Sequence, residues 1–314
     1  MKVFISYFKD YHKTFYNRNL YLTFGIVLFS FIFMNEFFHI EDRLIRNITN
    51  PFLYISAYIL EFFISYSIGV IIVKIFKKDS FKITKEYVLY ALIAIIIISI
   101  DRSINIFTHN IKQYIPREIY PASYYTIANA TSIVTMLVPL TLFKYLIDRN
   151  EDFGLYGLRF KGVSFAGYKT LLYIIIPLVF FASFIPEFIQ YYPTYKKLHG
   201  TVAAQYLGIP EFILVLVYEF IYLFDFLFTE LGFRGLLIIG LSRFIGKNSI
   251  LPMVMVYAIL HFGKPLGETI SSVFGGYILG ILALYSRNIW GGVALHCGVA
   301  LCMEIFAYMQ LSLH

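Results

Sequence analysis

The chain has 314 residues, of which 59% are hydrophobic and only 14% are charged, and its mean hydropathy is +0.71. A soluble domain usually carries about 25% charged residues, so this composition excludes the soluble class and indicates a membrane protein. The net charge of +7 does not indicate a nucleic-acid partner, because the Lys and Arg residues collect between the apolar segments, where membrane orientation and anionic headgroups favour them.

Long unbroken apolar runs predict an all-α fold, a polytopic transmembrane helical bundle of eight or nine helices. A β-barrel would instead alternate apolar and polar residues over short strands. With about 20 apolar residues per span, the expected segments are 20–38, 52–76, 87–107, 123–147, 169–191, 210–241, 249–261, 270–286 and 289–311. The run 249–261 is short for a full crossing, so we expect it to enter only part of the membrane.

The chain divides into an N-terminal transmembrane scaffold, residues 1–168, and a functional half, residues 169–314. The scaffold ends in an amphipathic connection in which Tyr156 and Phe160 are expected at the headgroup surface. Lys and Arg counts alternate between successive loops, which favours a cytoplasmic N-terminus in a bacterial plasma membrane. Asp101 and Arg102 are adjacent, so on a helix they point about 100° apart, and we expect each to pair with another span.

Between Phe228 and His296, three apolar segments carry four ionisable residues: Glu230, Arg234, His261 and His296. A charge inside a transmembrane segment costs at least ~2.5 kcal/mol, so such a residue usually faces the protein interior and has a partner. A structural explanation is also open, because Glu230 and Arg234 are four residues apart and could simply neutralise each other. The cluster of all four favours a shared, water-reachable cavity.

Small residues next to these positions indicate close helix packing. Ser272, Gly276 and Gly280 repeat every four residues, and Gly292 and Ala300 lie one turn either side of His296. Small residues let helices approach closely in a membrane. The helices around the polar residues are therefore expected to pack tightly together.

A carboxylate, two imidazoles and a guanidinium in a low-dielectric pocket suit hydrolysis. Carboxylate and histidine activate water as a general base, and the other imidazole stabilises the oxyanion. Glu230, His261 and His296 also form a donor set that suits a divalent metal such as zinc, with a fourth position open. The sequence does not decide between these two chemistries.

At these residues the chain resembles the CPBP family, named for CAAX proteases and bacteriocin-processing enzymes and also called Abi, which includes type II CAAX prenyl endopeptidases. The family motifs are Glu-Glu-x-x-x-Arg, Phe-x-x-x-His and His-x-x-x-Asn or Asp, each on its own transmembrane helix. In this chain the matching segments are Thr229-Glu230-Leu231-Gly232-Phe233-Arg234, Tyr257-Ala258-Ile259-Leu260-His261 and His296-Cys297-Gly298-Val299-Ala300.

The resemblance implies an integral-membrane endopeptidase that hydrolyses a peptide bond of a membrane-associated or lipid-modified protein or peptide. By position, Glu230 is the second glutamate of the first motif and Arg234 is its arginine. His261 corresponds to the water-activating histidine and His296 to the oxyanion histidine. The implied partners are membrane lipids and the peptide or lipid-modified substrate, and family labels also imply metal dependence.

Two departures from the family pattern weaken the catalytic interpretation. Thr229 stands where the first motif has the glutamate expected to act as general base. Ala300 stands where the third motif has the asparagine whose amide is expected to stabilise the oxyanion. Losing a positioned base typically costs about 10²–10⁴ in rate. Either Glu230 or Glu268 supplies the base, or the protein is a catalytically inactive membrane binding or scaffold protein. Glu268 could equally be a loop residue that only pairs with Lys264.

A transporter is the third candidate. Interior charges at Glu61, Asp101, Arg102, Glu219 and Asp225 favour it. It ranks last because the strongest cluster of ionisable residues lies in the C-terminal third of the chain.

Overall fold

The computed structural model describes residues 2–78, 80–149, 154–160 and 162–313, and this part of the chain is helical apart from one isolated bridge between Leu155 and Leu158. The α-helices are α1 (Lys2–Phe15), α2 (Arg18–Phe38), α3 (Pro51–Phe76), α4 (Lys85–Ser103), α5 (Tyr120–Ala130), α6 (Val138–Phe143), α7 (Ala166–Ala182), α8 (Pro186–Tyr191), α9 (Gly200–Leu207), α10 (Glu211–Glu230), α11 (Ser242–Ile245), α12 (Ile250–Leu260), α13 (Leu266–Ser286) and α14 (Trp290–Leu313). The 3-10 and π segments are η1 (Asp42–Arg46), η2 (Ile104–Ile106), η3 (Thr108–Gln113), η4 (Ile133–Leu137), η5 (Lys144–Asp148), η6 (Thr194–Leu198), η7 (Leu231–Gly240) and η8 (Gly246–Ser249).

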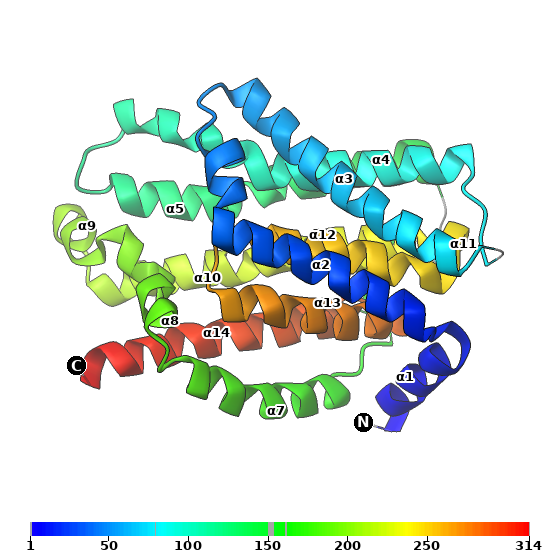
Figure 1. Cartoon of the computed structure of the whole chain (residues 1–314). Helices are drawn as coiled ribbons and strands as arrows, with labels where there is room; N and C mark the ends of the chain where they lie inside the picture. Colours follow the sequence, from blue (N-terminus) through cyan, green and yellow to red (C-terminus); the bar gives the residue numbers. More distant parts are fainter. Residues whose placement is uncertain (1, 79, 150–153, 161, 314) are drawn as a thin grey trace.

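The long helices lie roughly along one axis and form a bundle, with α1 at one end and α9 at the other (Figure 1). Seven helices in the described ranges are long and apolar enough to cross a membrane, or up to eight with the bent pair at α7 and α8. The expectation of an all-α polytopic bundle is confirmed. The count of seven or eight only reaches the lower bound of the expected eight or nine, because the segments 210–241 and 249–261 belong to one helical run, Glu211–Leu260.

That run reverses direction near α11, so α10 and α12 pass through the bundle in opposite senses (Figure 1). At 1.5 Å per residue, the eleven residues of α12 span only about 16 Å. A bilayer core is about 30 Å thick, so α12 alone cannot cross it. How far α12 enters the membrane stays a prediction from the short apolar run 249–261.

The segment expected as one straight helix over 169–191 is broken. Helix α7 ends at Ala182, and the next helical stretch leaves at an angle of 94°. Pro186 opens α8, and Ile185 before it is extended, with φ −79° and ψ 130°. A residue before proline is driven out of the α region by steric contact with the proline ring, which explains the break.

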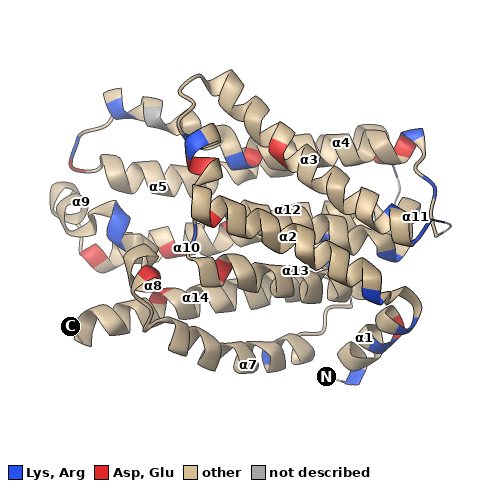
Figure 2. Cartoon of the chain, viewed as in Figure 1, with Lys and Arg blue, Asp and Glu red and all other residues tan. Residues whose placement is uncertain are grey.

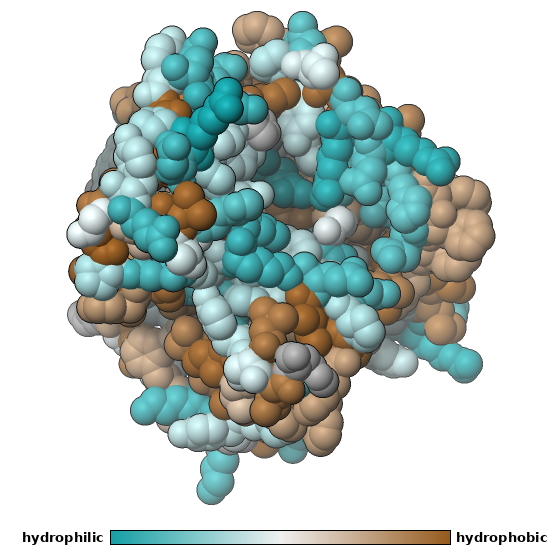
Figure 3. Space-filling model, turned by 90° about the vertical axis from the view of Figure 1, so that its left-hand side faces the viewer, coloured by the Kyte–Doolittle hydropathy of each residue, from teal (hydrophilic) through white to brown (hydrophobic). Residues whose placement is uncertain are grey.

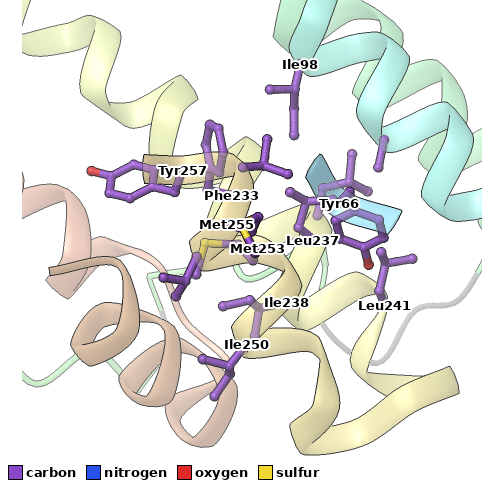
Figure 4. Close-up of a cluster of buried hydrophobic side chains, with 14 of the residues drawn as sticks. Tyr66, Ile98, Phe233, Leu237, Ile238, Leu241, Ile250, Met253, Met255 and Tyr257 are labelled. Carbon is purple, nitrogen blue, oxygen red and sulfur yellow. The ribbon is translucent and has the colours of Figure 1, made fainter. Parts of the chain in front are cut away.

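The core lies between α3, α4, η7 and α12. Figure 4 shows Tyr66, Ile98, Leu237 and Met253 packed together there, with Tyr257 at one edge. Lipid tails are as apolar as these side chains, so association depends on close packing and on small residues. Glycine supplies that closeness where α3 meets α12: a Cβ on Gly69 would lie 2.7 Å from the Cα of Pro252.

The connection before α7 packs inward more than expected. Tyr156 is only 2% exposed, and its hydroxyl donates to Asp148 at 2.8 Å, so it does not lie at the headgroup surface. Phe160 is exposed, as predicted, and stacks on Trp290 at 4.6 Å between ring centroids. Residues 150–153 and 161 of the predicted amphipathic connection lie outside the described residues.

Adjacent charges in the scaffold pair with other segments, as expected. The Thr135 hydroxyl donates to Asp101 at 2.5 Å, and Arg102 forms an ion pair with Glu41 at 3.3 Å. Because the two side chains leave α4 in different directions, they join different neighbours.

Candidate active site

Glu230 ends α10, and the backbone continues directly into the π-helical segment η7. Isolated π turns within α-helices are frequent at functional sites because they redirect side chains. Gly232 and Gly235, on either side of Arg234 in the sequence, both lie in η7. A Cβ on Gly235 would come within 2.8 Å of the Tyr156 carbonyl oxygen, so η7 approaches the connecting segment closely.

The Glu230 carboxylate is completely buried and joins two of the predicted site residues. Its Oε1 lies 2.9 Å from Nη1 of Arg234 and 3.2 Å from Nδ1 of His296. The contact with Arg234 is an ion pair whose angle does not meet that of a hydrogen bond, whereas the His296 contact does. Oε2 has no hydrogen-bond partner among the described residues.

A glycine on α14 makes room for this carboxylate. A Cβ on Gly292 would lie 2.5 Å from Oε2 of Glu230, closer than real Cβ contacts occur. Gly292 is one turn before His296, so the same face of α14 supplies both the space and the imidazole. The small residues predicted around His296 thus serve the approach of Glu230.

Arg234 is 1% exposed and its guanidinium carbon lies 4.0 Å from the centroid of the Tyr257 ring. A guanidinium over an aromatic face is attracted by the ring quadrupole, an interaction that strengthens where water is excluded. Tyr257 occupies the Phe position of the second motif, and its ring is also 4.7 Å from that of His261, edge to face. One aromatic ring therefore links the first and second motifs.

His261 lies immediately after the last residue of α12 and is 6% exposed. Its Nδ1 is 2.7 Å from the Tyr257 carbonyl oxygen. A carbonyl only accepts, so Nδ1 carries the hydrogen and Nε2 retains the lone pair of the neutral ring. The Tyr257 ring, which contacts both the His261 ring and the Arg234 guanidinium, connects His261 to Glu230 and its partners.

His296 is partly accessible, with 16% of its side chain exposed. Its ring packs 4.2 Å from that of Phe226 on α10. Because Nδ1 contacts the Glu230 carboxylate, Nε2 is the ring nitrogen left for a substrate or water. The structure thus brings Glu230, Arg234 and His296 into direct contact, and His261 is linked to them through the Tyr257 ring.

Glu268 lies in a neighbouring cluster. Oε2 accepts from the Tyr192 hydroxyl at 2.7 Å, and Oε1 accepts from Nζ of Lys264 at 2.6 Å. Burial lowers the pKa of Lys264, but the Glu268 carboxylate together with Tyr191 and Tyr257 gives a net rise of that pKa. The charge of Lys264 acts electrostatically on the two candidate catalytic histidines, His261 and His296. Lys264 and Glu268 are therefore coupled to these histidines by charge.

The sequence contained no signal for Tyr192. This residue lies in the connection after α8, far from the motifs, and its side chain is buried. Only the fold brings its hydroxyl to Glu268.

A pocket of about 320 Å³ opens beside this cluster and is lined in part by Lys264, Glu36, Glu187 and Gln190. It lies at the end of the bundle that is remote from α1. Figure 3 shows that end as largely hydrophilic and hollowed near its centre. Water and polar groups can therefore approach the protein surface next to the turn that carries His261.

The predicted metal ligands do not come together as a metal site. Among the described residues, no group of three His, Cys, Asp or Glu side chains is arranged to hold a metal ion. Glu230 directs one oxygen to Arg234 and His296, and Nδ1 of His261 is used by a backbone carbonyl. The donor set of Glu230, His261 and His296 therefore does not fit a metal in this arrangement.

Residues 209–302 match the protein-family model described as Rce1-like, type II CAAX prenyl endopeptidase Rce1-like. The matched segment contains every residue of the Glu230 cluster and also Glu268. No curated protein and no solved structure matches the chain.

Proposed function

Because residues 209–302 carry an Rce1-like domain of the CPBP family, we propose that this protein is an intramembrane endopeptidase. Its substrate would be a membrane-associated or lipid-modified protein or peptide. The observation that carries the proposal is the contact of His296 with the completely buried carboxylate of Glu230, 66 positions away, in a cluster that the Tyr257 ring links to His261.

His261 acts as the general base in this proposal. Its Nε2 lone pair takes a proton from the attacking water and later returns it to the leaving amine. The hydrogen bond from Nδ1 to the Tyr257 carbonyl supports this role, because it fixes the tautomer and the ring orientation. Oε2 of Glu230, without a protein partner, is a second acceptor for the water.

His296 stabilises the oxyanion. The contact of Nδ1 with the Glu230 carboxylate fixes the ring orientation, which leaves Nε2 to donate to the developing negative charge when the ring carries its second proton. Arg234 in turn holds Glu230 through the ion pair. Held by these two contacts, the buried carboxylate keeps its orientation.

The decisive experiment compares membranes that contain the wild-type protein with membranes that contain His261→Ala or Glu230→Gln. Trimmed or released peptides, identified by mass spectrometry, should disappear in both variants. His12→Ala and Glu118→Gln are matched controls, because both residues are exposed and lie outside the matched domain. Identical peptide profiles for wild type and His261→Ala would refute the endopeptidase proposal.

Glu268 is the second candidate for the base. In the observed arrangement it reaches the histidines only through Lys264. Glu268→Gln should leave most proteolysis intact if Glu268 only pairs with Lys264, and should match the loss in Glu230→Gln if it is the base. Tyr192→Phe is the control, because it removes the other hydrogen bond and keeps the carboxylate.

The substitutions at Thr229 and Ala300 favour a second candidate, a catalytically inactive protein that binds peptides in the same pocket. Thr229→Glu with Ala300→Asn restores the family pattern at both positions. If the restored variant cleaves peptides and the wild-type protein does not, the result supports the inactive binding protein. If the wild-type protein cleaves peptides, the result supports the enzyme.

We also propose that the end of the bundle carrying α1 and α11 faces the cytoplasm of a bacterial cell, with the protein in the plasma membrane. Lys and Arg residues gather at that end (Figure 2), and cytoplasmic loops carry an excess of these residues. Single cysteines at Lys247 and Lys112, which lie at opposite ends, should react with an impermeant maleimide from opposite sides of the membrane. Labelling of Lys247→Cys from outside intact cells would show that this end faces outward and would refute the proposed orientation.

A further inference from the structure

A buried ionic network in the N-terminal half is centred on Glu41, which is 3% exposed. Its carboxylate accepts from the Tyr58 hydroxyl at 2.8 Å and pairs with Arg102 at 3.3 Å and Arg46 at 3.2 Å. Its backbone N–H donates to the side chain of Asn35 at 2.9 Å. Groups from η1, α3 and α4 thus hold the carboxylate of Glu41, and Asn35 of α2 holds its backbone.

Arg46 carries this network to the turn that follows α12. Its Nη2 donates to the backbone carbonyl of Phe262 at 3.1 Å, across 216 positions of sequence. The other side of the guanidinium pairs with Asp42 at 3.0 Å. Arg46 is therefore held by two carboxylates and reaches the residue directly after His261.

The turn is shaped to admit this guanidinium. Gly263 has φ +75°, and a Cβ there would lie 2.0 Å from Nη2 of Arg46. The preceding carbonyl, that of His261, accepts from the Thr269 hydroxyl at 2.9 Å. Two side chains therefore hold successive carbonyls of the turn. Arg46, from the N-terminal half of the chain, holds that of Phe262, and Thr269, from the C-terminal half, holds that of His261.

These contacts matter because His261 lies at a helix end. Carbonyls at a helix C-terminus lack intrahelical partners, so the residues there depend on other groups for their position. The hydrogen bond from Nδ1 of His261 to the Tyr257 carbonyl at 2.7 Å leaves little room for the ring to move. A shift of the turn would misdirect Nε2.

We propose that Arg46 is a positioning residue for His261, held in place by Glu41 and acting through the Phe262 carbonyl. The inference rests on the proposed endopeptidase function for its catalytic consequence. It also extends the catalytic machinery beyond the matched domain, because Arg46 and Glu41 precede residue 209. The N-terminal half is then part of the active site's geometry and not only a scaffold.

The first test uses Arg46→Gln and Arg46→Lys in the full-length protein in lipid nanodiscs. The readout is the Cε1–H nuclear magnetic resonance signal of His261, assigned with His261→Gln. Arg46→Gln should shift or broaden this signal, and Arg46→Lys, which keeps the charge, should restore part of it. Arg43→Gln is the matched control, because Arg43 is an exposed residue of the same segment without an ion pair in the described chain.

A kinetic measurement separates positioning from substrate binding. A misplacement of about 1 Å at a distance from the chemistry can cost on the order of 10²-fold in rate. Arg46→Gln should therefore lower kcat by roughly tenfold to a hundredfold and leave KM unchanged. An unchanged His261 signal in Arg46→Gln, or a change confined to KM, would overturn the proposal.

The second test approaches the contact from the turn and keeps Arg46 in place. Gly263→Ala should disturb the His261 signal strongly in wild type, but less in an Arg46→Ala background, where the new methyl group meets no guanidinium. Strictly additive effects of the two substitutions would refute the contact. If the spectra behave as expected while His261→Ala leaves proteolysis unchanged, the endopeptidase proposal fails and the positioning of His261 by Arg46 stands.

Discussion

Replacing Gly292 with alanine should disable the site without removing any of its functional groups. The new Cβ would lie 2.5 Å from Oε2 of Glu230, whereas ordinary contact begins at 3.4 Å, so the two groups must separate by about 0.9 Å. Because the backbone of α14 is packed, the carboxylate is the group that yields. Its hydrogen bond to His296 is already 3.2 Å long, and a displacement of this size would break it.

The size of the effect follows from that bond. A hydrogen bond to a charged group contributes about 1.5–3 kcal/mol, which corresponds to a roughly tenfold to hundredfold loss in kcat/KM. The loss should appear in a peptide-cleavage assay with purified protein in nanodiscs. The His296 signal in a nuclear magnetic resonance spectrum should shift at the same time.

Gly275→Ala on α13 is the matched control. No atom lies within 4 Å of the Cβ that this substitution adds, so it should leave activity unchanged. Alanine is favoured over glycine in a helix by about 1 kcal/mol, and the control is expected to be neutral or slightly stabilised. Wild-type activity and an unchanged His296 signal in Gly292→Ala would refute the argument that this glycine makes room for Glu230.

Three further predictions concern the ion pair, the helix packing and the N-terminal helix. Arg234→Met leaves Glu230 buried without its cation and should destabilise the protein by about 3–5 kcal/mol in a denaturation assay, and adding Glu230→Gln should recover part of this loss. Gly69→Ala should lower the thermal midpoint of unfolding, because its Cβ would meet the backbone of Pro252 and overpacking costs about 1–3 kcal/mol. The control Gly275→Ala on α13 should not lower that midpoint. Lys247 and Tyr285 form hydrogen bonds to Asp10 and lower the pKa of its carboxyl. The docking of α1 should therefore be fully stable at pH values above the ordinary Asp pKa and should weaken as the pH falls through the lowered pKa. Hydrogen exchange of α1 measures this, and Asp10→Asn should reproduce the effect of acid at neutral pH.

Local patterns in the sequence were sufficient to predict most of the fold and the main cluster. Long apolar runs mark the spans, and rare charges inside them mark residues that need partners, which is why Glu230, Arg234 and His296 could be expected to meet. The same reasoning predicted that Asp101 and Arg102 join other segments. These inferences depend only on composition and helical periodicity.

The contacts between connecting segments could not be predicted in this way. The break before Pro186, the hydrogen bond from Tyr192 to Glu268 and the contact of Arg46 with Phe262 all involve turns or helix ends. Such segments have no period that relates one residue to another, and their partners are set by the packed bundle. The proline was visible in the sequence, but the direction taken by the chain after it was not.

The π-helical segment η7 has a consequence for how this region can change during evolution. A π turn holds more residues than an α turn, so it absorbs residues that an α-helix of the same length would exclude. Loss of a single residue between Glu230 and Gly240 would let a wide turn tighten into an α turn, which compensates for most of the roughly 100° change that the same deletion causes in a regular α-helix. Single-residue deletions in this stretch should therefore disturb the orientation of the flanking side chains less than deletions within α10.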